Sequence, residues 1–473
     1  MLLDDVLLDI FDFYRSNHNY THHPVWKWHI LVHVCQRWRQ VVFASPQRLK
    51  LQIPCTYGTP FRKTLGIWPA FPIVLDFRHF KTMTPYDEDN AIIALEHSDR
   101  VCSVWLNASG EQLRTMATLM QKPFPVLTLL EIVWNTYGSA PVLPADILGG
   151  SASRLQEITL IGVPFPALGT FLLSAGDLVK LYIFDPPPIG YISPETMVAC
   201  LAALPRLEIF VIKFRNNTPR PDRIRPPPAM QTVLPALTSF GSRAAIEYLE
   251  DLLAQIDSPQ LNRIDIEYLS RPGLVDFQVP QLSKFIDRSL GHRSTLLRCA
   301  DVSVSLRRVN FVLCCHANYP GGCGPHHSPV QTSISCAVFD LHTPRTTYLF
   351  SQFSTILSNV VHLKLEADRF GEDGPDPVEW PHILSRFPTA QTLRVSRTYA
   401  RLIALVLDDI TAEMAVQVLP TLDLIYLETR RLPPAFLPSV EKFVAVRRLS
   451  GRPITVVDTE VEFNERLKTY ITK

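Results

Sequence analysis

Features that mark several common protein classes are scarce or missing in this chain of 473 residues. Glycine is low at 19 residues, and no phosphate-binding glycine loop, nucleophile elbow or His-Glu-x-x-His motif stands out, so neither an enzyme nor a cofactor is expected. No run of about 20 apolar residues occurs, which excludes a membrane-spanning helix. The net charge is only +1, so no basic excess indicates binding to nucleic acid or to an anionic membrane.

Signs of export are missing as well. Asp4, Asp5 and Asp9 stand where a signal peptide would need a basic start and an unbroken apolar run. The nine cysteines are an odd number, and most lie in apolar segments, so we expect reduced thiols rather than a disulfide framework. The predicted compartment is therefore the cytoplasm or the nucleus.

Proline, in contrast, is abundant at 40 residues. Because proline breaks helices and is barred from central strands, this content predicts many short elements joined by stiff turns. The length of the chain exceeds that of one compact core, so two or more domains or one elongated solenoid are expected.

Two amphipathic helices are predicted near the start of the chain. In the first, apolar residues recur at steps of three and four and share one face: Val6, Leu7, Ile10, Phe11 and Tyr14. In the second, the same spacing links Leu31, Val34, Cys35, Trp38, Val41 and Val42, and Pro46 marks the expected end. On periodicity alone, the favoured interpretation is a helical hairpin that closes the core of a larger domain.

The two helices also carry a specific pattern: Asp4-Asp5-Val6-Leu7-Leu8-x-Ile10-Phe11, then Leu31-Val32-x-Val34-Cys35-x-x-Trp38-Arg39, then Ser45-Pro46. This pattern resembles the F-box, a small helical module that docks on the Skp-type linker of cullin–RING ubiquitin ligases. The chain is similar, more closely, to a large fungal group of F-box proteins with divergent leucine-rich repeats. That further similarity runs through Arg62-Lys63-Thr64-Leu65-x-Ile67-Trp68-Pro69-Ala70.

The resemblance implies which residues contact the linker or form the core of the module: Val6, Leu7, Ile10, Phe11, Val34, Trp38 and Val41. It does not say which of them point outward. The chain departs from the family in having Leu2-Leu3 where Leu-Pro usually precedes the acidic pair, which puts the linker affinity in doubt. The polar gap at 15–27 is also longer than in compact F-boxes.

An internal repeat emerges from about residue 100 onward. Its unit is apolar-x-x-apolar-x-apolar, and nine copies start at Val101, Leu127, Leu155, Leu178, Leu207, Leu261, Val360, Ala390 and Leu422. Most copies follow at the spacing of leucine-rich repeats, at or slightly above its upper end. Because each short strand cannot bury its own face, the strands are predicted to stack into a curved parallel sheet with helices on its convex side.

The expected fold is thus α/β, with a small all-α module followed by a leucine-rich-repeat-like solenoid. We assign 1–48 to the F-box module, 49–99 to a linker and first strands, 100–435 to the solenoid and 436–473 to a C-terminal cap. The period breaks in the irregular section 274–358, where strands are predicted at 274–279, 302–304, 309–313 and 334–339. Degenerate repeats are the default interpretation there, and an inserted subdomain is the alternative. In the cap we predict a helix at 437–449, a strand at 454–457 and a helix at 460–470.

Candidate target-binding residues follow from the alternation of side chains along a strand, which turns the residues between apolar positions toward the concave face. The candidates are Trp105, Tyr182, Arg263, Asp265, Glu267, Lys364, Arg394 and Tyr426. For any one of them, a solvated position without a partner is favoured. For the surface as a whole we favour protein binding, because solenoids bind on this side and aromatic and arginine side chains serve as anchors.

One cluster has the side-chain types of a zinc site: Cys314, Cys315, His316, Cys323 and His326. Thiolates and imidazoles suit tetrahedral zinc, but the spacing matches no common finger and a flexible loop also accounts for it, so no metal is predicted.

With the resemblance, the sequence predicts a non-catalytic, substrate-recognition adaptor of an SCF-type cullin–RING E3 ubiquitin ligase. Its implied partners are the Skp-type linker, through it a cullin, and an unknown protein target. The alternative is a non-ligase interaction scaffold with a degenerate F-box.

Overall fold

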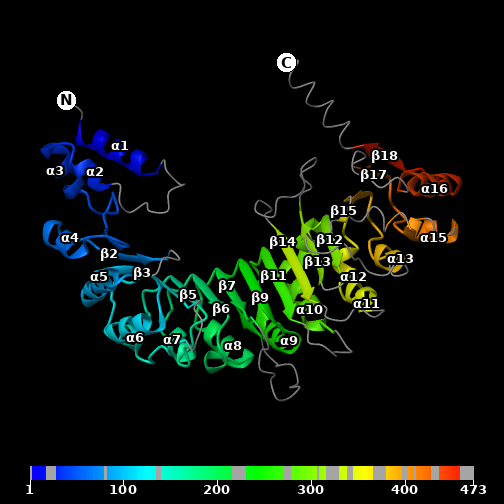
Figure 1. Ribbon diagram of the computed structural model, residues 1–473. Helices are drawn as coiled ribbons and strands as arrows, with labels where there is room; N and C mark the ends of the chain where they lie inside the picture. The colour runs from blue at the N-terminus through cyan, green and yellow to red at the C-terminus, as the bar shows by residue number, and fades with distance from the viewer. Residues whose placement is uncertain are drawn as a thin grey trace. The chain divides into compact units, whose positions relative to one another are not determined.

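The computed structural model describes residues 3–16, 28–78, 83–134, 140–215, 231–269, 278–305, 308–315, 330–337, 345–365, 380–396, 403, 405–407, 412–427 and 436–458. The protein is mixed α/β, and 16 of its strands form one mostly parallel sheet (Figure 1). The chain divides into two compact units, Met1–Ile192 with Ala199–Leu207 and Ser193–Val198 with Glu208–Lys473. Among the described helices, none has the length and apolarity needed to cross a membrane.

The first unit opens with three helices, α1 (Asp4–Ser16), α2 (Trp28–Val32) and α3 (Gln36–Ala44). The prediction of one continuous second helix is therefore wrong. Cys35 has an extended backbone (φ −160°, ψ 168°), and its Sγ accepts a hydrogen bond from the Trp38 N–H at 3.4 Å, so it caps a new helix. The break turns Val34 and Cys35 outward, away from the apolar face on which their spacing would place them.

Six parallel strands follow in chain order within this unit. They are β1 (Ile53–Thr56), β2 (Ile73–Phe77), β3 (Val101–Asn107), β4 (Leu129–Val133), β5 (Glu157–Ile161) and β6 (Lys180–Phe184). The elements between them include α4 (Phe61–Ile67), α5 (Pro85–Glu96), α6 (Gly110–Leu119), η2 (Ile147–Gly150) and α7 (Leu168–Leu172), and η3 (Pro188–Gly190) follows β6. Since β1 and β2 belong to the same sheet, parallel pairing begins well before residue 100.

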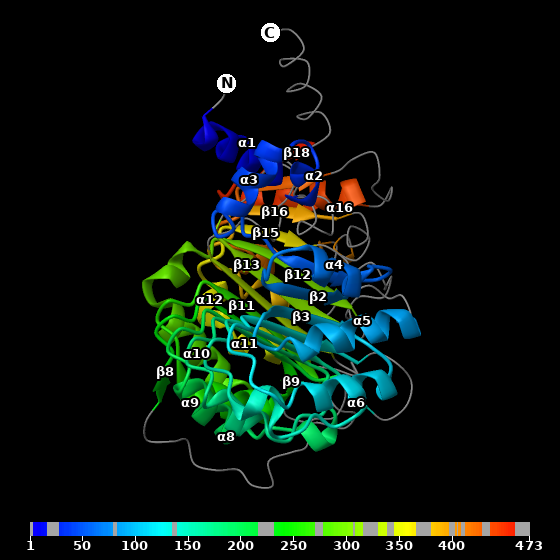
Figure 2. The same cartoon turned by 90° about the vertical axis from the view of Figure 1, so that its left-hand side faces the viewer.

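The apolar positions of the hexads in β3–β6 are buried, as predicted, whereas β1 and β2 are buried along their whole length. In β4 and β6 the burial alternates strictly, with Leu130, Ile132, Leu181 and Ile183 inside. Helices such as α5 and α6 lie on one side of the strands (Figures 1 and 2). We call the other side the helix-free face, and its side chains are those between the buried positions.

The second unit continues this organisation with β7 (Ile209–Lys213), β9 (Ser239–Ala245), β11 (Arg263–Leu269), β15 (His362–Leu365), β16 (Thr392–Val395), β17 (Leu424–Leu427) and β18 (Thr455–Asp458). Its helices are α9 (Ile246–Gln255), α10 (Pro280–Leu290), η4 (Gly291–Leu296), α11 (Arg345–Gln352), α12 (Ser354–Leu357), α13 (Trp380–Leu384), α15 (Ala412–Gln417) and α16 (Phe436–Leu449). Helix α8 (Pro194–Ala202) crosses the unit boundary, and β8 (Thr232–Val233) pairs with β10 (Ile256–Asp257) in a separate small sheet.

The irregular section departs from the expected all-parallel sheet. Strands β12 (Cys299–Ser305), β13 (Arg308–Cys314) and β14 (Gln331–Ala337) form an antiparallel meander, and they enter the sheet in reverse, in the order β11-β14-β13-β12-β15. As a result, β13 runs against all its neighbours. The pieces predicted as strands at 302–304, 309–313 and 334–339 fall within or overlap these three strands. The piece predicted at 274–279 lies mostly outside the described residues, and its last residue, Val279, precedes α10 directly.

At the C-terminal end, α16 and β18 match the predicted helix and strand closely. Strand β18 pairs with β17 in parallel and is the last strand of the sheet. The predicted helix at 460–470 lies outside the described residues.

Candidate interaction surfaces

Helix α1 carries apolar side chains on two faces. Leu7, Leu8 and Phe11 are buried, and the Phe11 ring meets Trp38 of α3 edge-on at 4.8 Å. A second set at i, i+3, i+7 and i+10 is exposed, with fractions of 73 % for Leu3, 40 % for Val6, 44 % for Ile10 and 67 % for Phe13. We call these four residues the α1 stripe.

The residues that the F-box resemblance implied are therefore divided between two environments. Leu7, Phe11 and Val41 are buried in the helical module and Trp38 is half-buried, so these side chains build its core. Val6, Ile10 and Val34 are exposed. Leu3 and Phe13 were missed, although the second apolar spacing of α1 is visible in the sequence.

Ion pairs hold the remaining side of α1. Asp4 accepts a hydrogen bond from the Arg37 guanidinium at 2.7 Å, and Arg48 lies against both Asp9 and Asp12. These pairs are largely exposed, so each adds little free energy. The face of α1 that turns inward is set by the burial of Leu7, Leu8 and Phe11, and the ion pairs are compatible with it.

An aromatic cluster joins the helical module to the first strands. The Trp28 ring meets Trp68 edge-on at 5.2 Å and Phe71 at 5.7 Å, and Phe43 contacts all three rings. The Trp28 indole N–H also donates to the carbonyl of Gln52 at 3.0 Å. Aromatic pairs of this kind add about 0.5–1.5 kcal/mol each beyond area burial. Trp68 belongs to the segment 62–70, which carries the further resemblance to the fungal group. In this structure that segment therefore has a packing role.

On the helix-free face of the first unit, the strand register aligns one side chain per strand into a central row. Its members are Asp76, Trp105, Glu131, Thr159 and Tyr182. Two of the predicted residues, Trp105 and Tyr182, thus lie in one row. Glu131 was missed, although it occupies the same position within its hexad as Trp105 does.

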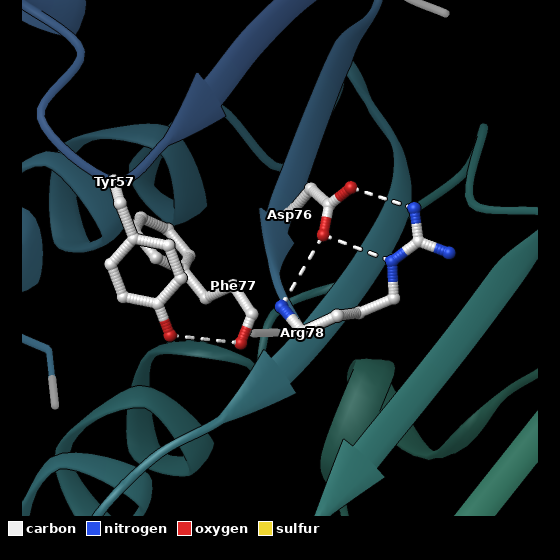
Figure 3. Close-up of polar contacts among 4 residues, drawn as sticks. All are labelled: Tyr57, Asp76, Phe77 and Arg78. Atoms are coloured by element: carbon white, nitrogen blue, oxygen red, sulfur yellow. Dashed lines mark hydrogen bonds and ion pairs between the residues drawn. The ribbon is translucent and has the colours of Figure 1, made fainter. Parts of the chain in front are cut away.

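Asp76 and Arg78 form a bidentate ion pair at one end of this row (Figure 3). The Arg78 Nε and Nη2 donate to the two oxygens of Asp76 at 3.0 and 2.7 Å, and the Arg78 backbone N–H adds a contact at 3.3 Å. The guanidinium lies 4.3 Å from the centre of the Trp105 ring. The hydrogen bond to Asp76 raises the pKa of Arg78, so the guanidinium group stays charged.

Tyr57, the residue after β1, supports the same corner (Figure 3). Its hydroxyl donates to the Phe77 carbonyl at 3.2 Å, and its ring meets the Phe77 ring edge-on at 5.0 Å. Burial, reinforced by the charges of Asp87 and Asp76, raises the pKa of Tyr57 to about 12, so the hydroxyl remains a donor at neutral pH.

Glu131 occupies the centre of the row. It is half-buried, and burial raises the pKa of its carboxyl group; Arg78 opposes this rise, while Glu157 and Asp76 add to it. Glu157 itself is paired with Lys180 at 3.1 Å. Glu131 has no hydrogen bond or ion pair within the described part of the chain.

Beside the central row lies a second, apolar row. Val133, Ile161 and Phe184 are in register and half-exposed. The Phe184 ring stacks near that of Tyr182, with centres 6.2 Å apart and planes inclined by 15°. The face thus combines an anionic centre, aromatic side chains and an apolar border.

The second unit presents the other predicted residues in two groups. On β11, Asp265 pairs with Lys213 at 3.0 Å and Glu267 with Arg243 at 3.5 Å, while Arg263 is exposed. Further along the sheet, Lys364, Arg394 and Tyr426 lie in register in a single row. Lys364 also pairs with Asp301 at 3.4 Å, and that aspartate was not predicted because β12 lies outside the regular repeat.

The cysteine–histidine cluster is only partly described. Cys314 is buried and Cys315 half-buried, whereas His316, Cys323 and His326 lie outside the described residues. Within the described ranges, no group of three or more His, Cys, Asp or Glu side chains could hold a metal ion.

Comparison with known proteins yields little. No family model matches the chain, and no curated protein matches it. Among solved structures, it is similar to the leucine-rich repeat-containing protein LegL7 from Legionella pneumophila, with 13 % identity over 76 % of this chain and 96 % of that one. The TM-score is 0.27, which is too low to carry an argument.

Proposed function

We propose that this chain is a protein-binding adaptor that serves as the target-recognition subunit of an SCF-type cullin–RING ubiquitin ligase. In this proposal the helical module α1–α3 binds the Skp-type linker and through it a cullin, in the cytoplasm or nucleus. The helix-free face of the sheet binds a protein target. The chain supplies binding and geometry, and other subunits supply the chemistry.

The α1 stripe is the observation that carries the proposal. Apolar side chains that stay exposed on one helix face mark a protein contact more often than they mark a stable free surface. The stripe includes Val6 and Ile10, which the F-box resemblance independently assigns to the docking helix. Burial of four such side chains under a partner would contribute several kcal/mol at about 25 cal/mol per Å².

The aromatic cluster of Trp28, Phe43, Trp68 and Phe71 supports the second half of the proposal. It packs the module directly against the first strands. A target held on the face of the same unit would therefore keep a fixed distance from the linker, which is what an adaptor requires to raise the local concentration of target lysines.

Co-purification with a purified Skp-type linker tests the docking. Replacing Val6 and Ile10 together by Asp places two charges on the stripe and should abolish capture of the linker. Neither side chain contributes to the buried core, so the double variant should still fold. The matched control changes one exposed Ile and one exposed Val elsewhere in the unit, Ile67→Asp with Val142→Asp, and should bind like the unmodified chain. Equal loss in both double variants would count against a specific contact.

The alternative, a scaffold outside any ligase, has one observation in its favour. Leu3, exposed at 73 %, stands where the F-box family usually has the proline that helps shape the linker contact. If the unmodified chain captures neither linker nor cullin, the ligase role fails and the scaffold function replaces it.

A further inference from the structure

We infer that the helix-free face of the first unit binds an extended basic segment of a target protein, with one lysine or arginine side chain seated against Glu131. This rests on the proposed function, because it names the kind of segment that the target-binding face would take. The inference adds the chemical class of the partner, a basic segment, and names the residue that binds it, Glu131.

The charges on this face carry the inference. Along β2–β6 and the residue after β2, the described face holds three carboxylates, Asp76, Glu131 and Glu157, and two cations, Arg78 and Lys180. Arg78 is bound bidentately by Asp76 and Lys180 is paired with Glu157. Both cations are thus already engaged in ion pairs, and Glu131 is the carboxylate of this set without one; the attraction that acts on its charge is the longer-range one of Arg78.

Glu131 is also poorly solvated for a carboxylate. It is half-buried between its register neighbours Trp105 on β3 and Thr159 on β5. A charge held in such surroundings without a partner is unfavourable, and an arriving ammonium or guanidinium group would relieve it by a charge-assisted hydrogen bond. The same charge repels phosphate groups, so a nucleic acid does not fit this face.

The aromatic residues of the row suit a cation as well. The Trp105 ring takes the guanidinium of Arg78 at 4.3 Å, so a cation–π contact already occurs in this row. Tyr182 lies two strands beyond Glu131 in the same row and is half-exposed. A basic side chain at Glu131 therefore lies along a row with an aromatic residue on each side.

The spacing of the row favours an extended peptide over a compact cation. Parallel strands lie about 4.8 Å apart, so the three intervals from Trp105 to Tyr182 span roughly 14 Å. An extended chain covers that distance with about four residues. The adjacent row of Val133, Ile161 and Phe184 offers apolar contacts to the side chains that flank the basic one.

The test is a selection from a phage-displayed library of random dodecapeptides on the full chain. We expect enriched peptides to share a lysine or arginine flanked by apolar residues. Glu131→Gln keeps the shape of the side chain and removes its charge, so it should bind a selected peptide about tenfold more weakly by fluorescence anisotropy. The matched control, Glu96→Gln at the exposed end of α5, makes the same change in net charge and should bind as the unmodified chain does.

Cross-linking locates the peptide. A photoreactive group next to its basic residue should attach to β3–β6 in the unmodified chain. The inference is overturned if no peptide is enriched, if enriched peptides lack basic residues, if Glu131→Gln binds normally, or if the cross-links fall elsewhere. Competition by spermine at an affinity equal to that of the peptide would also overturn it, because the face would then bind any polycation and not an extended peptide. None of these assays contains the linker, so their failure is separable from failure of F-box docking.

Discussion

Glu250 shows how burial and helix geometry act against each other on a single carboxyl group. The side chain extends from α9 to the start of α10, where it accepts the backbone N–H groups of Gln281 at 2.7 Å and Leu282 at 3.2 Å. These hydrogen bonds, and one from the Tyr268 hydroxyl at 3.5 Å, favour the charged form. Burial is the larger effect and, with a small addition from Asp251, raises the pKa of Glu250 to about 7.

This pKa predicts that part of the stability is lost as the pH rises. The folded chain keeps the proton up to about pH 7, whereas a glutamate in the unfolded chain releases it near its ordinary pKa of 4.5. The folded state thus binds more protons between these values, and its stability falls as the pH increases through that range. Glu250→Gln, neutral throughout, should show a smaller drop in thermal midpoint between pH 5 and pH 8.

The control for Glu250 is Glu441→Gln, which removes an exposed carboxylate on α16. It should leave the difference between the two midpoints unchanged. If Glu250→Gln also leaves the difference in thermal midpoint unchanged, the carboxyl group of Glu250 is ionised in the folded chain from pH 5 to pH 8. The two backbone N–H donors then outweigh burial in setting its pKa.

At the scale of elements, the start of α3 depends on an unusual cap. Cys35 caps the helix through its sulfur, which is a weak acceptor. Serine is among the preferred residues at this position, so Cys35→Ser should raise the free energy of unfolding of the first unit by about 0.5–1 kcal/mol. Urea unfolding followed by tryptophan fluorescence measures this, since Trp28 and Trp38 flank the cap.

The comparison with Cys35→Ala isolates the capping contribution. Alanine removes the acceptor without replacing it and should be slightly less stable than the native cysteine. Equal stability of the serine and alanine variants would show that the extended backbone at Cys35 is held by packing of α2, and that the side chain contributes nothing.

The same elements show how far the sequence alone reaches. The hexads predicted the buried positions of β3–β7, because alternation along a strand is a local property. The reversal of β12–β14 could not be read, since it depends on β14 pairing with β11 over the whole seven-residue register, a contact between distant segments. The break before α3 was also missed, because the apolar spacing of α2 and α3 is compatible with one helix.

The residues of the candidate interaction surfaces were likewise predicted only in part. Trp105 and Tyr182 were found because aromatic side chains at outward positions are conspicuous. Asp76 and Arg78 were missed because their role comes from the register that brings β2 beside Trp105, and the segment 49–99 was assigned to a linker and first strands ahead of the repeats. The exposure of the α1 stripe likewise depends on which face of α1 packs against α3, and the sequence pattern fits both faces.

At the scale of the whole molecule, stacked repeats contact mainly their neighbours, so damage at one end should stay local. The C-terminal end provides the test. Arg447 of α16 is completely buried, and its guanidinium donates to the carbonyl oxygens of Pro420 at 3.3 Å and Leu422 at 3.2 Å, just before β17. This side chain therefore ties α16 to the segment that leads into β17.

Arg447→Met keeps much of the apolar volume and removes the guanidinium donor of the Leu422 carbonyl, which costs about 1–3 kcal/mol, while the Pro420 carbonyl keeps a bond from Arg452 at 3.1 Å. We expect amide hydrogen exchange in β17 and β18 to become at least tenfold faster, while β1–β6 keep their native rates. Arg448→Met, an exposed neighbour on the same helix, is the control and should change neither region. Faster exchange in β1–β6 would show instead that the sheet unfolds as a single cooperative body, which a nearest-neighbour stack does not allow.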